Sequence, residues 1–545
     1  MSAPAKASSR WLFGPSPDLL LGCGVGYAAL FLLMCAYGSR VRPETASLIP
    51  FLTLIFGAPH YGATLLRVYA RREDRRAYAL FAVYATALLA AAFVAATRSA
   101  QLGSLLLTVY LTWSPWHYTG QNYGLAVMFL RRRGIALGPA LKRCIYASFV
   151  LSYALTFTAM HQVDPTSYAP SIYTGYHMLA LGIPHAVASV AILVLVLGYA
   201  LTLAVAAALL LRRATPRDLA PTALLALTQA LWFSIPVVAR SWGVLQGVEP
   251  FASQYSTYYF FWAAIGHSVQ YVWVASYYAR SASDFAGLGR YFWKALLAGA
   301  AIWTIPPLLF APHLLGQIPF DAGLGALVAS VVNIHHFVLD GAIWKLRDGR
   351  IARVLIRSEP LPTSAAPIKA APRLGWLAAL GWGVGAASLG IVLFAQYAQE
   401  IGHRAWESGD AERMRLASRR LHWIGRESAN VELQLGRLLA SRGDARAALL
   451  SYRESIEIQP TADAWVALGA LFQDAGKLDR AEDALAHAVE LAPEQADVAY
   501  RAGALALERG DAARAQVLLA RAVSLDPDKK LYRVMLDRAR AGASD

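Results

Sequence analysis

This 545-residue chain has few cysteines and few charged residues, and each shortage excludes a class of protein. The three cysteines, Cys23, Cys35 and Cys144, lie in or beside apolar stretches, so the sequence offers no disulfide framework and no cysteine-based zinc site. Only 16% of the residues are charged, against roughly 25% in an average soluble protein, and 57% are hydrophobic. A purely soluble protein is therefore excluded.

Apolar runs of about 20 residues, long enough to cross the roughly 30 Å core of a bilayer, recur through the first 400 residues. The first run is too long for a signal peptide and lacks a small-residue cleavage site after it, so it predicts a retained span. The sequence thus predicts a protein that lies in a lipid bilayer and crosses it eleven times. The predicted spans are 17–38, 45–66, 77–97, 102–130, 139–160, 184–211, 219–238, 252–279, 292–311, 321–344 and 375–397.

Basic residues are concentrated in alternate connecting segments of this part. Residues 1–400 carry a net charge of +16 and residues 401–545 a net charge of −1. Since cytoplasmic loops carry the excess of Lys and Arg, the alternation places the N-terminus in the cytoplasm. Eleven spans in a bacterial inner membrane would then put the C-terminal part in the periplasm. That part has balanced charges and no basic stripe with interleaved aromatics, so we expect no nucleic-acid partner.

A period of 33 to 34 residues marks the C-terminal part. Each repeat has a first glycine, an alanine twelve residues later and a proline twenty-four residues later; the three sets are Gly436, Ala448 and Pro460, then Gly469, Ala481 and Pro493, then Gly503, Ala515 and Pro527. A second glycine, at 443, 476 or 510, stands where a helix must end and the chain turn back. The pattern predicts three helix-turn-helix pairs over residues 429–530.

Trp465, Leu468 and Gly469 form an intact Trp-x2-Leu-Gly element, and with it this segment resembles the tetratricopeptide repeat (TPR) family. The resemblance implies a superhelical array whose concave groove binds a peptide or a partner protein and that performs no catalysis. Bracing of the membrane part, or self-association, is the alternative role.

These observations together predict an all-α fold, a polytopic bundle of about eleven spans followed by a TPR solenoid. We expect a membrane domain at 1–397 with a proline-rich cytoplasmic linker at 361–372, a connector or degenerate repeat at 398–428, three repeats at 429–530, and a capping helix with a tail at 531–545.

Histidines lie inside several predicted spans, namely His60, His117, His267, His335 and His336. Ionisable residues within spans are costly and rare, and they usually face the bundle interior. Counted from the basic residue that ends each span, they lie roughly 10 to 21 Å from the cytoplasmic ends, so four helices offer imidazoles at one level. Adjacent helical residues point about 100° apart, so only one of the neighbouring pair needs to face inward. His336 is favoured because it shares a helix face with Asp340.

One helical turn separates His117 from Gln121 and His336 from Asp340, so Gln121 and Asp340 can orient the ligands or a substrate. Neutral imidazoles suit zinc, copper or iron, and an all-nitrogen site with open positions suits Fe(II) working with oxygen. We therefore expect a transition metal, with iron first and haem as the alternative. A structural polar network and a proton or substrate pathway are the interpretations that need no metal.

The segment GAPHYGAT at 57–64 and the other histidine-bearing helices resemble the bacterial membrane carotenoid-cleaving oxygenases of the Blh type. The resemblance implies that histidines from several spans hold one iron. Tyr61 and Thr64 stand where that family has a glycine and an acid, so only the type of site is carried over.

Four functions compete. The first is an oxidative metalloenzyme acting on a lipid or isoprenoid that enters from the bilayer. The second is a non-enzymatic scaffold or transporter that recruits a partner through its repeats. The third, a polyprenol-dependent glycosyltransferase, needs essential acids in a long first outer loop; the predicted loop at 39–44 is short and offers only Glu44, which disfavours it. The fourth is a haem-binding electron carrier, in which paired histidines on facing helices would ligate iron axially.

Overall fold

The computed structural model describes residues 10–33, 35–36, 51–70, 72–163, 175–244, 256–346, 348–359 and 375–541. Within these ranges the chain is helical and forms no β-strand, and an isolated bridge pairs Gln162 with Ile183. The chain divides into two compact units, Met1–Pro307 with Gly325–Val392 and Leu308–Leu324 with Leu393–Asp545. The all-α prediction is confirmed at this level.

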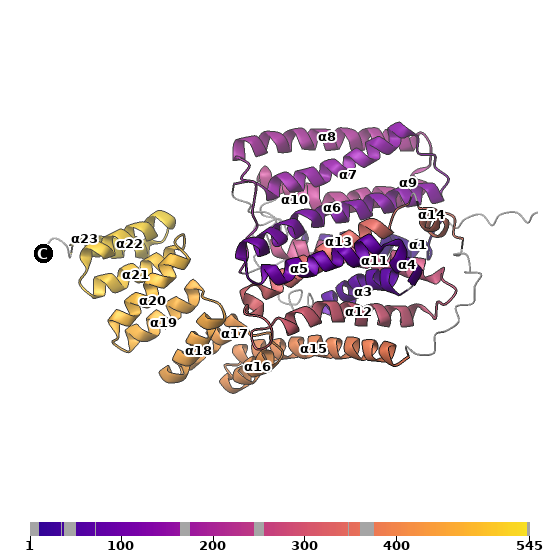
Figure 1. The fold of residues 1–545 in the computed structure, drawn as a ribbon. Coiled ribbons are helices and arrows are strands. Elements are labelled where there is room, and N and C mark those ends of the chain that lie inside the picture. Colours follow the sequence, from indigo (N-terminus) through magenta and orange to yellow (C-terminus); the bar gives the residue numbers. More distant parts are fainter. Residues whose placement is uncertain are drawn as a thin grey trace, which may run out of the picture. The chain divides into compact units, whose positions relative to one another are not determined.

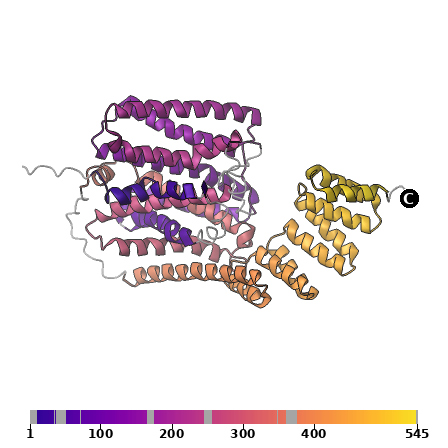
Figure 2. The same ribbon diagram turned by 180° about the vertical axis from the view of Figure 1, so that it is seen from behind.

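The first unit consists of long helices that run side by side (Figure 1; from behind in Figure 2). Its elements are α1 (Pro15–Pro17), η1 (Asp18–Gly22), a helix at Val25–Leu33, η2 (Thr53–Gly57), α3 (Ala58–Tyr69), α4 (Arg72–Ala77), η3 (Leu80–Ala85), α5 (Thr86–Ala96), α6 (Ala100–Arg132), α7 (Pro139–Met160), α8 (His185–Leu211), α9 (Pro216–Gln229), η4 (Ala230–Ser234), α10 (Ile235–Ser241), α11 (Ser256–Arg280), α12 (Leu288–Leu309), α13 (Gly325–Ile343), α14 (Gly349–Leu355) and the first half of α15 (Gly375–Glu407).

The number of candidate membrane spans is smaller than the sequence predicts. Six helices are long and apolar enough to cross a membrane, or seven if the bent pair Pro15–Gly22 and Val25–Leu33 is one span. The six are Pro139–Met160, His185–Leu211, Pro216–Ser241, Leu288–Leu309, Phe320–Ile343 and Gly375–Glu407. The prediction of eleven is therefore wrong for the described part of the chain.

Length and polarity explain the difference at three predicted spans, and a fourth is only partly described. The predicted span at 77–97 is a helix of only 17 residues, Leu80–Ala96, and residues 45–50 of another lie outside the described ranges. The predicted spans at 102–130 and 252–279 are the long helices α6 and α11, which carry polar residues on their buried faces. The first outer loop at 39–44 and the linker at 361–372 also lie outside the described residues, and the side of the membrane that holds the repeats stays a prediction.

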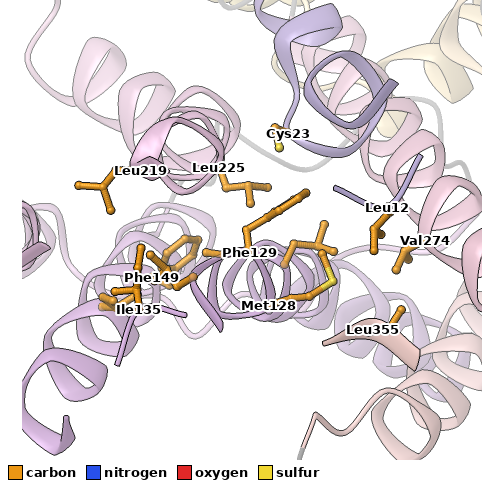
Figure 3. Close-up of a cluster of buried hydrophobic side chains, with 14 of the residues drawn as sticks. Leu12, Cys23, Met128, Phe129, Ile135, Phe149, Leu219, Leu225, Val274 and Leu355 are labelled. Atoms are coloured by element: carbon orange, nitrogen blue, oxygen red, sulfur yellow. The ribbon is translucent and has the colours of Figure 1, made fainter. Parts of the chain in front are cut away.

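A core of buried apolar side chains ties the N-terminal segment to the middle of the first unit (Figure 3). Phe129 of α6 is fully buried there, with Leu225 of α9 and Val274 of α11 in the same cluster. Asp18 adds a polar link, because its carboxylate accepts hydrogen bonds from the backbone N–H of Leu12 (2.6 Å) and from the Trp273 indole (3.1 Å). The N-terminal segment is thereby fixed against α6 and α11.

Helices α3 and α12 approach each other at backbone distance. A Cβ added at Gly62 would lie 1.7 Å from the carbonyl oxygen of Ala295, and one added at Gly299 would lie 1.7 Å from that of Ala58. Glycine is therefore required at both positions, since any side chain would force the helices apart.

The second unit carries three helix pairs, followed by one further helix (Figure 1). They are α17 (Ala429–Ser441) with α18 (Ala445–Ile458), α19 (Ala462–Asp474) with α20 (Leu478–Leu491), α21 (Ala496–Glu508) with α22 (Ala512–Leu525), and α23 (Lys530–Ala541). The second glycine of each repeat, Gly443, Gly476 or Gly510, has a φ of +67° to +81° just after its first helix. These glycines end the helices as their spacing predicts.

A further helix pair precedes the repeats, in the segment predicted to be a connector or degenerate repeat. The pair consists of the last turns of α15 and the whole of α16 (Ala411–Trp423). Ala405 and Met414 from this pair belong to the same buried cluster as Leu433 and Tyr452 of the first repeat. The pair thus extends the hydrophobic core of the array by one step toward the N-terminus.

We expect Gly299→Ala to lower the stability of the first unit by about 2 kcal/mol or more, because the new methyl group collides with the α3 backbone. Thermal unfolding of the purified protein in detergent measures the effect. The matched control is Gly289→Ala on the same helix, where an added Cβ meets nothing within 4 Å. Equal melting temperatures for both variants would contradict the close approach.

Candidate metal centre

Four helices of the first unit bring four of the predicted histidines together. His60 lies on α3, His117 on α6, His267 on α11 and His336 on α13. Each offers one ring nitrogen, and these four atoms all lie within 4.8 Å of one another. We call these residues the histidine cluster. The ring centroids are 4.2 Å apart for His60 and His336, and 4.9 to 5.0 Å apart for His60–His267, His117–His267 and His117–His336.

The cluster is buried, and each of its four rings has at least one nitrogen without a hydrogen-bond partner. His60, His267 and His336 are only 1–2% exposed. Nε2 of His60, His117 and His336 and both ring nitrogens of His267 have no hydrogen-bond partner. A buried polar atom left unsatisfied costs about 1 to 3 kcal/mol, so four such residues at one point call for a shared ligand.

For His60 and His336, a hydrogen bond at the far nitrogen fixes which ring atom faces the centre. Ser268 donates its hydroxyl hydrogen to the carbonyl of Ala264 (2.9 Å), so its oxygen accepts from Nδ1–H of His60 (3.2 Å). This leaves the lone pair of His60 Nε2 directed into the cluster. A second residue that holds the distal nitrogen is the usual support of a metal-bound histidine.

The support of His336 runs through a buried network. Nδ1 of His336 lies 3.0 Å from the hydroxyl of Thr64, which donates to Oδ1 of Asp340 (3.2 Å). The Tyr271 hydroxyl donates to the same carboxylate oxygen (2.6 Å) and accepts from the indole N–H of Trp344 (3.0 Å). With its hydroxyl hydrogen on Asp340, Thr64 accepts the Nδ1 hydrogen, and Nε2 of His336 faces the cluster.

Asp340 has its second oxygen beside the cluster. Oδ2 lies 3.7 Å from Nε2 of His336 and 3.8 Å from Nε2 of His117. These distances are beyond hydrogen-bond length, so the carboxylate borders the centre without bonding to either ring. It can orient a bound molecule or take up a proton there.

Two predicted residues do not support or join the ring nitrogens of the histidine cluster. Gln121 does not support the His117 ring; its Nε2 donates to the backbone carbonyl of His267 (3.2 Å) and to Oε1 of Gln270 (3.0 Å). His335 points away from the cluster, and its Nε2 lies 3.0 Å from the hydroxyl of Thr86. The helix geometry explains the second result, because His336 faces the cluster from the adjacent position.

The sequence reasoning missed four residues that hold the cluster: Thr64, Ser268, Tyr271 and Trp344. Spacing could have found three of them, because Thr64 follows His60, Tyr271 follows His267 and Trp344 follows Asp340, each by four residues. Ser268 carries no such signal, because its contact with His60 depends on helix rotation.

The cluster geometry fits a metal ion. Ligand nitrogens about 2.0 to 2.1 Å from a metal in a tetrahedral site lie roughly 3.4 Å apart, so side-chain shifts of about 1 Å would close the ring. The donor set is neutral nitrogen, with a carboxylate at its border. Such a set suits zinc, copper or iron rather than magnesium or calcium.

A cavity of about 310 Å³ lies against the cluster. His117, Tyr271 and Asp340 form part of its wall, and most of the rest is aromatic or aliphatic. A molecule in this cavity would therefore reach the cluster from one side.

Comparison with known proteins identifies the C-terminal part. A tetratricopeptide repeat model matches residues 462–495. The C-terminal part carries a tetratricopeptide repeat. The TPR prediction is thereby confirmed for this segment, which is indicative of a protein-interaction module. No curated protein matches the chain.

Similar solved structures have little sequence identity to this chain. Two are entitled crystal structures of MamA. The first is 21% identical over an alignment that covers 28% of this chain and 83% of that chain, with a TM-score of 0.25. The second is 22% identical over 26% of this chain and 85% of that chain, with a TM-score of 0.24. A third, YrrB, is described as a TPR protein with an unusual peptide-binding site. It is 20% identical over 29% of this chain and 80% of that chain, with a TM-score of 0.23.

We expect Tyr271→Phe to destabilise the first unit by about 1 to 3 kcal/mol, because Asp340 loses its shortest hydrogen bond and Trp344 loses its acceptor. Thermal unfolding in detergent tests this. Tyr146→Phe is the matched control, since Tyr146 is 46% exposed on α7. The network described above is contradicted if the two variants unfold alike.

Proposed function

We propose that the histidine cluster binds one transition-metal ion, that the first unit lies in a membrane, and that the protein is an oxidative enzyme acting on an apolar substrate. The observation that carries this proposal is the set of buried ring nitrogens, from four helices, that face one another without partners. The repeats would supply a docking site for a protein or peptide partner.

The surface of α8 supports the membrane location. Val190, Val194, Leu197 and Leu201 repeat at helical spacing and are each 62–64% exposed. Exposing a continuous apolar stripe to water is unfavourable, whereas lipid chains would solvate it.

A metal explains the cluster better than a polar network does. A network would pair the ring nitrogens with one another or with hydroxyls, yet the inward nitrogens lack any hydrogen-bond partner. A bare ion also fits better than haem, because four imidazoles around one point occupy the positions that a porphyrin would need.

Oxidative chemistry with dioxygen follows from the donor set. Nitrogen ligands that leave positions open suit Fe(II) and oxygen. Cleavage of a C=C bond by O₂ to two carbonyl groups balances without an external electron donor, since both oxygen atoms end in the products. This is the chemistry that the resemblance to Blh-type oxygenases implies. Thr64, at the position of that family's acid, donates to the carboxylate of Asp340 here, so α13 would supply the acid.

The second candidate is a scaffold or transporter that recruits a partner, and the TPR match is the observation that favours it. In that case the histidine cluster would be structural and its loss would leave recruitment unchanged.

We expect the purified protein, prepared without chelator, to contain one transition-metal ion per chain, iron first, and His60→Ala and His267→Ala to lose it. Elemental analysis measures the content, and an optical spectrum detects a Soret band if haem is bound instead. His335→Gln is the matched control, because His335 neighbours the cluster in sequence but faces Thr86.

A monodisperse, helical wild-type protein without metal would overturn the metal proposal and favour the scaffold. Loss of metal in all three histidine variants would also count against the assignment, because His335 lies outside the cluster. Retention in the control and loss in the other two supports it.

A further inference from the structure

The cavity beside the histidine cluster has walls suited to an uncharged, apolar molecule. Trp113, Leu125, Met128, Val274 and Phe337 are among its lining residues. Asp340 is the charged residue of the lining, and its Oδ1 accepts from Tyr271. An anionic group on the ligand would find no lysine or arginine side chain in this lining, which disfavours it.

The cavity is elongated. It follows α6 from Trp113 to Met128, a span of fifteen residues or about 22 Å of helix. Its volume of about 310 Å³ is roughly twice that of a cavity that holds benzene, so about a dozen carbon atoms fit inside. A lining that extends this far along one helix, around this volume, suits a single extended chain better than a compact ring system.

Three glycines keep this space open. Gly120 and Gly124 lie one turn apart on α6, and Gly341 lies on α13. A Cβ added at any of them would meet nothing within 4 Å, because each faces the empty space. Larger residues here would fill the cavity without colliding with the backbone of a neighbouring helix.

The same glycines mark where the cavity opens. Gly120 and Gly341 are exposed although they line the cavity, and Trp116, which precedes His117 on α6, is 38% exposed. The cavity is therefore accessible at residues of α6 and α13. In a membrane location, these residues face lipid chains.

We infer that this cavity binds one linear apolar chain, an acyl or prenyl chain with about a dozen carbons inside, that enters from the bilayer between α6 and α13, and that Gly120, Gly124 and Gly341 determine its width. The inference deepens the proposed function and rests on it for the chemistry, since His117 and Asp340 place the bound chain against the histidine cluster.

The test uses the full-length protein in lipid nanodiscs and a 12-carbon alcohol with a photoreactive diazirine on its chain. Mass spectrometry maps the labelled peptides. We expect labelling of α6 residues 113–128, and about a tenfold reduction of that labelling in Gly120→Leu and Gly124→Leu, where the new side chain occupies the cavity. Labelling of the exposed α8 stripe is the internal reference and stays constant.

Gly381→Leu on α15 is the matched control, because Gly381 is an exposed helical glycine whose added Cβ also meets nothing within 4 Å. Metal content and size-exclusion profile, measured on the same preparations, report folding. Unchanged α6 labelling in both cavity variants, or labelling of α6 no stronger than that of α8 in the wild type, would overturn the inference. Chain labelling in a metal-free wild type would instead overturn the metal proposal alone.

Discussion

The inward nitrogens of the four imidazoles impose the constraint on which the rest of the first unit depends. Uncharged rings that present lone pairs to one another at 4.8 Å or less gain nothing from that arrangement by themselves. Their positions are instead maintained from outside, by Ser268 behind His60 and by the network of Thr64, Tyr271 and Asp340 behind His336. Ser268 of α11 supports His60 of α3, Thr64 of α3 contacts His336 of α13, and Tyr271 of α11 donates to Asp340 of α13. These contacts therefore also tie α3, α11 and α13 together.

Two helices that carry the histidine cluster, α6 and α11, are not among the candidate membrane spans. Helix α6 buries Asn122 and places His117 and Gln121 inside the unit, and α11 buries His267, Ser268 and Gln270. Such residues lower the hydropathy of a helix, yet a helix surrounded by other helices does not need an apolar surface all round. Counting apolar runs therefore predicted these elements but could not say which of them are enclosed by other helices.

Prediction from sequence succeeded where a property repeats along the chain and stopped where it depends on rotation. The TPR period located the turn glycines 443, 476 and 510, because a positive φ requires glycine wherever the fold places it. The expectation that four helices bring histidines to one level came from counting residues between each histidine and the basic end of its helix. The partners of those histidines did not follow: Thr86 for His335 and the His267 carbonyl for Gln121 are contacts between helices whose packing order the sequence does not express.

Glycine is used in two opposite ways around the same cluster. Gly62, two residues after His60, and Gly299 let α3 and α12 touch at backbone distance, which closes the structure behind the cluster. Gly120, Gly124 and Gly341 leave open space in front of it. The first kind tolerates no side chain because the neighbouring backbone cannot move away, whereas the second tolerates one sterically and loses only volume. A substitution of the same chemical type should therefore affect stability at the first pair and ligand access at the other three, which separates the framework of the site from its specificity.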